Sequence, residues 1–354
     1  RGLIEEAINI LDIGPDEMIN NIWKAYLKKD KSELTHSLSN SSIDYAFPFR
    51  RESIKTLSWA KDTYNNWKID YLLALNLWGK GRHEDSQNLL SNIKNQSDNS
   101  IFYLNRGLML EKLGVDPIND FNKSYKLNNK NWRTARTLSN YHFNSKNYKL
   151  SHDILKKAFN NDKSNYIIGM DYVKTLVKLE KYASSISVLD NLHILPYEHA
   201  GEGRELYTSA YFGLAMKKII SSNYKEALGI LNKSKIWPEN LGVGKPYTPD
   251  ERIQDYLIFY CMNKLNDSSS KNYLSDIIKY TEKNINTMSV NHILGYEAIK
   301  IIRGEKSSEN FIKNLVSIHK IDTEEMKFII DFKTNNFSKD YKKFDLLHKI
   351  LLLK

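Results

Sequence analysis

Turn-forming residues and cysteine are scarce in this sequence. It contains only 15 glycines and 7 prolines among 354 residues. Because tight turns depend on these two residues, their scarcity disfavours an all-β fold and favours long helices joined by short connections. The one cysteine, Cys261, cannot form an intramolecular disulfide and provides no metal-binding motif. It lies in an apolar stretch, so we expect a buried thiol.

Long apolar runs are also missing. No stretch approaches the 20 apolar residues of a membrane-spanning helix, so we predict no membrane span. No signal peptide opens the chain, which starts at Arg1 in a helical pattern. We therefore expect a domain cut from a longer protein. Its compartment cannot be inferred from the sequence.

The net charge of +10 comes from 52 basic and 42 acidic residues. A basic balance permits nucleic-acid binding. The lysines are scattered beside acids, however, and no arginine cluster or lysine-rich run marks a nucleic-acid patch. Nucleic acid is therefore a disfavoured partner. A basic surface still attracts anionic partners over long range.

An internal repeat is the main feature that is present. Tyr148 and Tyr182 lie 34 positions apart, which is the period of tetratricopeptide repeats. In both copies a small residue and then a leucine follow at the same spacing. A third copy starts at Tyr224, and its spacing of 42 indicates about eight inserted residues.

The first helix of each repeat carries a small residue among large apolar ones. Small side chains allow two antiparallel helices to approach closely. Gly81 and Gly114 follow where a first helix must end, because glycine accepts a positive φ angle. We therefore predict an all-α, tetratricopeptide-like helical-hairpin solenoid, coiled as a right-handed superhelix with a concave groove. The small residues are Ala74, Gly107, Ser139, Val173 and Ala215.

Three regions are predicted along the chain. Residues 1–46 form N-terminal helices, residues 47–285 form the repeat array, and residues 286–354 form C-terminal capping helices. The last helix carries an apolar stripe that suits a terminal cap. The predicted hairpins of the array span 67–95, 99–128, 131–161, 164–193, 203–236 and 249–283.

Two inserted loops, 195–207 and 237–252, are more particular than a generic repeat. Their sequences are Leu-Pro-Tyr-Glu-His-Ala-Gly-Glu-Gly-Arg-Glu-Leu-Tyr and Trp-Pro-Glu-Asn-Leu-Gly-Val-Gly-Lys-Pro-Tyr-Thr-Pro-Asp-Glu-Arg. With Phe-Pro-Phe-Arg at 47–50 and the segment 165–172, they resemble the C-terminal repeat region of a large bacterial family. That family joins an N-terminal β-rich domain of unknown function to a tetratricopeptide array. The resemblance covers roughly residues 45–265.

The resemblance implies a function only indirectly. The family's N-terminal part is similar to carbohydrate-active β-sandwich folds, which implies a sugar-processing context. On that basis this chain is the array without the catalytic part. The alternative function is then the accessory wall of a carbohydrate-active hydrolase, with a glycan as a further possible ligand.

Two local patterns invite chemical interpretations. Gly242-Val-Gly244-Lys245 is similar to a phosphate-binding loop, but Glu239 and Pro246 occupy positions where that motif needs Gly and Ser or Thr. A rigid connection explains the segment better. The first loop gathers glutamates around His199, a set that can ligate metal or transfer protons, yet its spacing matches no zinc motif.

Function is therefore expected to be binding. We predict a non-catalytic scaffold for a protein partner or for the protein's own N-terminal domain, with no catalytic residue, metal or cofactor assigned to this chain. Inserted loops of solenoids tend to gather on one face, often the binding face. The predicted contact residues are Glu198, His199, Arg204, Glu205, Asn240, Lys245 and Arg252.

Overall fold

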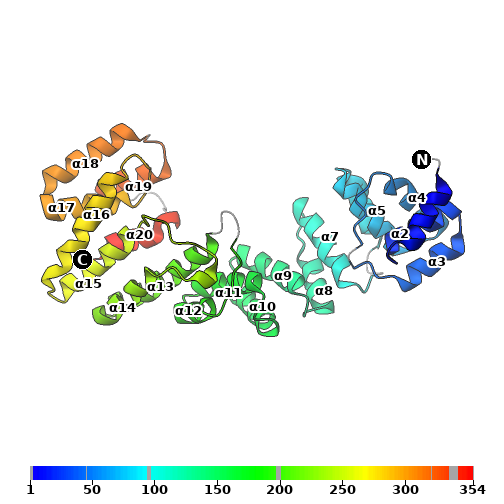
Figure 1. The fold of residues 1–354 in the computed structure, drawn as a ribbon, viewed down its shortest axis with the longest axis horizontal. Helices are drawn as coiled ribbons and strands as arrows, with labels where there is room; N and C mark the ends of the chain where they lie inside the picture. The colour runs from blue at the N-terminus through cyan, green and yellow to red at the C-terminus, as the bar shows by residue number, and fades with distance from the viewer. Residues whose placement is uncertain are drawn as a thin grey trace. The chain divides into compact units, whose positions relative to one another are not determined.

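The regular structure of the chain is entirely helical. The computed structural model describes residues 3–44, 46–93, 97–196, 201–319, 321–334 and 342–353, and within these ranges it contains 20 α-helices and no strand (Figure 1). The predicted all-α, helical-hairpin fold is confirmed. Contacts between helices divide the chain into two compact units, residues 1–161 and 162–354. The predicted domain boundaries after residues 46 and 285 stay predictions.

Unit 1 begins with four helices and continues with hairpins. α5 packs on α6, α7 on α8, and α9 on α10. Its helices are α1 (Ile4–Ile13), α2 (Met18–Lys28), α3 (Lys31–Asn40), α4 (Ser53–Thr63), α5 (Trp67–Gly79), α6 (His83–Ile93), α7 (Ser100–Lys112), α8 (Ile118–Leu127), α9 (Trp132–Asn144) and α10 (Tyr148–Asn161).

Unit 2 repeats the arrangement, with α11 on α12, α13 on α14, α15 on α16, and α17 on α18. A short 3₁₀ turn, Glu239–Leu241, lies in the second inserted loop. Its helices are α11 (Tyr166–Lys178), α12 (Tyr182–Leu189), α13 (Glu202–Ile220), α14 (Tyr224–Ser234), α15 (Arg252–Lys264), α16 (Lys271–Lys283), α17 (His292–Arg303), α18 (Glu305–Ile318), α19 (Glu324–Lys333) and α20 (Asp345–Leu351).

The turns of six hairpins, from α5–α6 to α15–α16, share one geometry, whereas the α17–α18 turn at Gly304 differs. Gly81 and Gly114 have φ angles of 78° and 74°, as the sequence predicted. After each turn residue, the next amide donates to a carbonyl five residues back, as Arg82 N does to Leu77 O at 3.0 Å. This is the Schellman arrangement that ends helices. Four further hairpins reach the same left-handed conformation without glycine, at Lys146, Glu180, Ser222 and Asn266.

Small residues set the distance between paired helices. A Cβ atom on Gly107 of α7 would lie 2.6 Å from the Phe121 ring of α8. In the α5–α6 hairpin, the Ser86 hydroxyl donates to the Ala74 carbonyl at 2.8 Å. Ser139, Val173 and Ala215, the other small residues that we predicted to be packed, are buried as well. The sequence pattern therefore identified the helix contacts of the hairpins.

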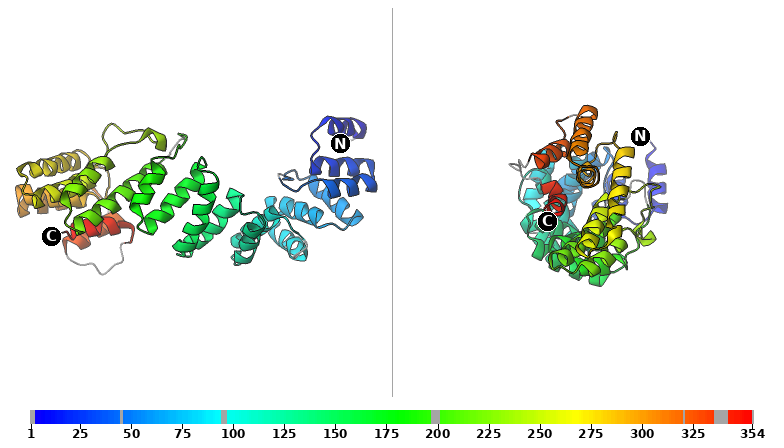
Figure 2. Two further views of the ribbon diagram at one scale, coloured as in Figure 1. Left: turned by 90° about the horizontal axis from the view of Figure 1, so that it is seen from below. Right: turned by 90° about the vertical axis from the view of Figure 1, so that its left-hand side faces the viewer.

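The C-terminal helix does more than cap the last hairpin. Phe344, just before α20, packs its ring 5.1 Å from that of Phe328 in α19. Lys349 of α20 also lies within electrostatic reach of Glu180 and Tyr182, at the turn between α11 and α12. In Figure 1 and in the left view of Figure 2 the red α20 lies beside green and yellow helices of unit 2. The buried face of α20 belongs to an apolar cluster that also contains residues of α13.

Candidate functional site

The two inserted loops lie against each other. We call residues 190–196 and 235–251 the loop platform. Asn240 joins its two parts, because its amide donates to the Leu189 and Leu192 carbonyls at 3.0 and 2.7 Å. The Asn240 carbonyl accepts from Ile194 N at 2.8 Å. The side chain and the backbone of Asn240 thus hold the two loops together.

The first loop is shorter than predicted. Residues 202–207 belong to α13, which begins at Glu202. Glu202 and Glu205 fall in its first turn, where acidic side chains complement the positive end of the helix dipole. Their charge, which made the segment resemble a polar loop, is therefore a signal of a helix start.

Gly242 allows the loops to approach closely. Its φ angle is 68°, and a Cβ atom there would lie 2.7 Å from the Ile194 carbonyl oxygen. Gly203, in the first turn of α13, faces the same loop, and a Cβ atom on it would lie 2.9 Å from the Leu241 carbonyl oxygen. Only glycine accepts both the conformation and the proximity found at Gly242, so this glycine of the Gly-Val-Gly pattern serves the backbone, whereas Gly244 has open space around its Cβ position.

Arg204 holds the far end of the platform. Its guanidinium donates to the Ile236 and Ser234 carbonyls at 2.5 and 2.8 Å, where α14 has just ended. The group also lies 4.3 Å from the centre of the Trp237 ring, at cation–π distance. Arg204 is 9% exposed, so its contacts are inside the chain.

Arg252 ends the second loop and is 2% exposed. Its Nε and Nη2 donate to the two oxygens of Asp250, at 2.8 and 2.7 Å. The remaining donors reach Thr281, Ser289 and His292, at 3.3, 3.1 and 3.0 Å. A guanidinium has five N–H donors, and all five are used here. Arg252 therefore has no donor left for a partner.

Electrostatics around Arg252 fix two protonation states. Burial alone raises the pKa of Asp250, but its hydrogen bonds to Arg252 and Asn291 and the arginine charge outweigh burial, so its pKa lies below the ordinary value. Burial lowers the pKa of His292 to about 4, and the charge of Arg252 acts in the same direction. The neutral His292 can then accept from Arg252 through Nδ1 and donate to the Thr287 carbonyl through Nε2, at 2.9 Å.

Other platform residues face outward. Lys245 is exposed, and so is Glu205 on the neighbouring α13. Leu195 and Ile236 are 72% and 55% exposed, and Tyr247 is fully exposed at 107%. The platform therefore has internal residues that hold its shape and an outer surface of apolar and charged side chains.

The predicted contact residues fall into two groups. Glu205 and Lys245 are on the surface, whereas Arg204, Asn240 and Arg252 are engaged in internal bonds. Glu198 and His199 lie outside the described residues. That these residues contact a partner stays a prediction.

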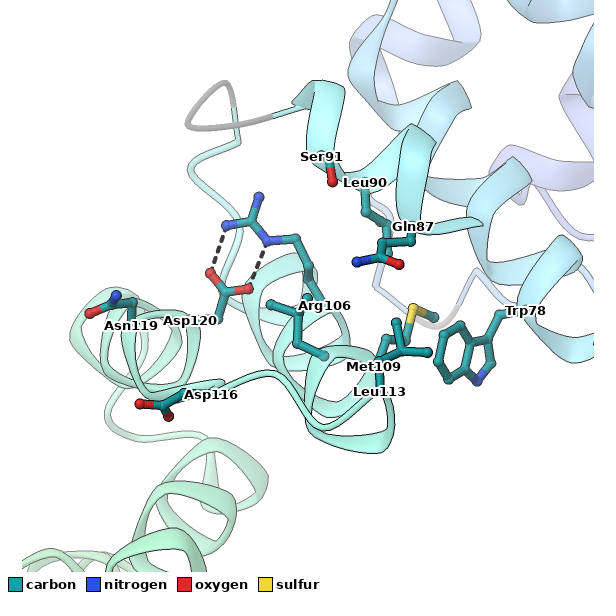
Figure 3. Close-up of a pocket in the computed structure, with 11 residues that line it drawn as sticks. Trp78, Gln87, Leu90, Ser91, Arg106, Met109, Leu113, Asp116, Asn119 and Asp120 are labelled. Atoms are coloured by element: carbon teal, nitrogen blue, oxygen red, sulfur yellow. Dashed lines mark hydrogen bonds and ion pairs between the residues drawn. The ribbon is translucent and has the colours of Figure 1, made fainter. Parts of the chain in front are cut away.

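A pocket in unit 1 was not predicted from the sequence. It has a volume of about 230 Å³ and lies between the α5–α6 and α7–α8 hairpins (Figure 3). Trp78, Met109 and Leu113 form an apolar side, and Arg106 lies opposite, in a two-pronged ion pair with Asp120 at 2.7 and 2.6 Å.

The pocket exists because two neighbouring hairpins are spread apart. α8 packs closely against α9, whereas α6 does not pack closely against α7 over their described residues. A wider gap leaves the Trp78 side chain partly exposed. The indole at the end of α5 was the only sequence signal, and it is equally typical of packed residues.

A second hollow, of about 500 Å³, lies beside the extended segment after α3. Phe47 lines it and is 60% exposed. The amide groups that line it are partly engaged, since Asn105 donates to the Tyr71 hydroxyl and Asn99 to Asp44, at 2.6 and 3.4 Å. Both hollows could receive partner side chains, but neither gathers chemically reactive groups.

The described ranges contain neither a cluster of metal-ligand side chains nor a membrane-spanning helix. No group of three or more His, Cys, Asp or Glu side chains is placed to hold a metal ion there. Among the described helices, none combines the length and apolar character needed to cross a bilayer.

Comparisons with known proteins give weak likenesses. No family model and no curated protein matches the sequence. The C-terminal part of a tetratricopeptide repeat-containing protein from Cytophaga hutchinsonii is 12% identical, with a TM-score of 0.40, over 85% of this chain and 99% of that chain. A tetratricopeptide repeat protein from Parabacteroides merdae is 12% identical, with a TM-score of 0.40, over 76% and 99%.

Yeast Tom70 is 12% identical, with a TM-score of 0.35, over 99% of this chain and 73% of its own. Likenesses of this strength carry no functional conclusion. The tetratricopeptide-like fold rests on the hairpins, small-residue contacts and shared turns of the chain itself.

Proposed function

We propose that this chain is a non-catalytic helical-repeat scaffold that binds a protein partner through the loop platform. Tyr247 carries the proposal, because its side chain is fully exposed on a loop whose base is held by Asn240. A tyrosine on a fixed loop loses little conformational freedom on binding and supplies a large contact area.

The surroundings of Tyr247 support a protein partner. Leu195 and Ile236 add exposed apolar area on the same two loops, and Lys245 and Glu205 add charges of both signs. An apolar centre with a polar rim is the usual composition of protein interfaces. Arg204, Asn240 and Arg252 have an indirect role in this proposal, which is to hold the platform in shape.

The finer proposal is that the partner is an N-terminal domain of a longer protein that includes this array. The two loop sequences that carry the family resemblance are the segments that build the platform. A carbohydrate-hydrolase wall is not proposed, because no feature of the described residues favours it.

A photo-crosslinking experiment tests the platform. The photoreactive residue benzoylphenylalanine replaces Tyr247 in one protein and Tyr64, which is 41% exposed in unit 1, in a second protein. Both are irradiated in an extract of the source organism. We expect position 247 alone to give a discrete crosslinked band, which mass spectrometry then identifies.

A matched set of substitutions controls the result. Leu195→Ser with Tyr247→Ala removes the platform's apolar contacts, whereas Ile10→Ser with Ile13→Ser removes side chains that are 69% and 88% exposed on α1. The first pair should abolish recovery of the identified partner, and the second should leave it unchanged. Equal recovery by both variants would rule out the platform as the contact surface.

A further inference from the structure

The C-terminal helix α20 is strongly amphipathic. Phe344 just before it and Leu347 and Ile350 within it are 7%, 4% and 0% exposed. They recur every three residues, which places them on one face of the helix. Asp345 and Lys349 lie on the other face and pair with each other at 2.7 Å.

The buried face of α20 belongs to the main apolar cluster of unit 2. That cluster also contains Phe212 and Met216 of α13. Phe344 contacts Phe328, so the seat of α20 includes α19 as well. The seat is therefore built by helices from different hairpins.

The exposed face of α20 is not part of the seat. Lys349 pairs with Asp345 of the same helix, and Glu180, whose charge also acts on Lys349, is paired with Lys217 of α13 at 3.3 Å. The seat of α20 is therefore the surface formed by α19 and by the apolar cluster that includes α13.

A helix of this length does not form by itself. α20 has 7 residues, and isolated helices shorter than about 12 residues are marginal in water. Its conformation therefore depends on the surface that it covers. α20 therefore resembles a helical peptide bound in an apolar groove, except that this peptide is part of the same chain as its receptor.

We propose that the surface beneath α20 is a binding site for an amphipathic helix of a partner protein, and that α20 occupies this site in the isolated chain. The partner helix carries large apolar residues at three-residue spacing, as Phe344, Leu347 and Ile350 do. This site uses none of the loop-platform residues, so it does not depend on the function proposed above.

Attachment gives α20 an advantage over any free helix. A tethered segment has an effective concentration in the millimolar range, so a free helix of equal affinity competes poorly. The partner must therefore bind more tightly than α20, or α20 must be weakened. A direct test therefore weakens the binding of α20 to its seat.

The experiment uses the full chain and a fluorescein-labelled synthetic peptide of residues 342–353. Leu347→Asp with Ile350→Asp introduces charges into the buried face and should release α20. Fluorescence anisotropy should show the peptide binding this variant about tenfold or more tightly than the wild type. A peptide with the same two substitutions should bind neither protein.

Two further variants separate release of α20 from damage to the fold. Lys349→Ala changes only the exposed face and should leave weak, wild-type peptide binding. If the double variant loses more helical circular dichroism signal than α20 alone accounts for, the milder variant Ile350→Ala is used. We expect this variant to bind the peptide about threefold or more tightly than the wild type does. The proposal is overturned if a folded variant with weakened α20 binds the peptide no more tightly than the wild type does.

Discussion

Arg252 and Asp250 form a two-pronged ion pair, with Nε–Oδ1 and Nη2–Oδ2 distances of 2.8 and 2.7 Å. The arginine side chain is 2% exposed and the aspartate side chain 28%. The planar fork of arginine matches a carboxylate in this arrangement. The pair connects the end of the loop platform to α17, because Arg252 also contacts His292.

Removing this arginine should destabilise the fold strongly. Arg252→Ala removes the main partner of Asp250 and a partner of the buried His292. Breaking a fully buried pair costs about 3–5 kcal/mol, so we expect about 2–3 kcal/mol here, because Asp250 is 28% exposed and keeps its bond from Asn291. Arg252→Lys should recover little, because an ammonium cannot supply the same fork of donors. Urea denaturation measures the change in the free energy of unfolding.

An exposed ion pair provides the comparison. Arg303 and Glu282 have side chains that are 47% and 48% exposed, and Arg303→Ala should cost less than about 1 kcal/mol. Similar costs for the two arginine variants would show that the Arg252 network adds nothing beyond a surface contact.

The state of His292 predicts a pH dependence of stability. Its pKa is about 4 in the folded chain and near the ordinary 6.5 when unfolded. As pH falls below 6.5, the unfolded chain binds a proton that the folded chain does not. The fold therefore loses stability between pH 6.5 and 4, by up to ~3 kcal/mol, and keeps this contribution above pH 6.5.

Urea denaturation of the wild type and of His292→Gln across this window checks the effect. Burial raises the pKa of Asp255 and of Glu297, which acts in the opposite sense in the same window. Both groups remain in the variant, so the difference between the proteins isolates the histidine. The wild type should lose more stability than the variant on acidification, and parallel curves would contradict the assignment.

Two glycines within helices should respond to alanine with opposite signs. A Cβ on Gly213 would lie 2.2 Å from the Tyr182 ring, so Gly213→Ala forces a shift that costs about 1–3 kcal/mol. Gly229 has no atom within 4 Å of its Cβ position, so Gly229→Ala should stabilise α14 by about 0.5–1 kcal/mol. Thermal unfolding measures the melting temperature of each variant. Shifts in the same direction for Gly213→Ala and Gly229→Ala would contradict the packing argument.

Asn240 should control the coherence of the loop platform. Asn240→Ala removes the hydrogen bonds to the Leu189 and Leu192 carbonyls, of which Leu189 keeps only the Leu192 amide, at a local cost of about 1–3 kcal/mol. Hydrogen exchange should accelerate at the Ile194 amide, which donates to the Asn240 backbone. Exchange in α17 serves as the control and should not change. An unaltered rate at Ile194 would mean that other contacts hold the loops.

The sequence was sufficient for the hairpins. The predicted unit 131–161 corresponds to α9 and α10, which span Trp132–Asn144 and Tyr148–Asn161. This agreement has a physical basis, because close helix packing requires small residues at fixed positions and these are visible in the sequence. Turns were harder, since Lys146 and Ser222 adopt the same left-handed conformation as Gly81 without its sequence signal.

The orientation of the candidate residues could not be predicted. Arg252 is a charged residue in a polar loop, and its partners Thr281 and His292 lie 29 and 40 positions away. Only the packing of three helices reveals that the side chain is internal. The pocket beside Trp78 was missed for a related reason, because it depends on the spacing between two hairpins rather than on any residue.

The burial of α20 has a consequence for how unit 2 folds. In a solenoid whose repeats touch only their neighbours, structure can nucleate in one repeat and spread outward, and terminal repeats can fray independently. Here the last helix buries its apolar face in a cluster that also contains Phe212 and Met216 of α13, across a large sequence separation. Such a non-local contact slows folding. It also links the last helix and α13 in one cooperative transition, so shortening the chain from its C-terminus should weaken the α13–α14 hairpin as well as the last helices.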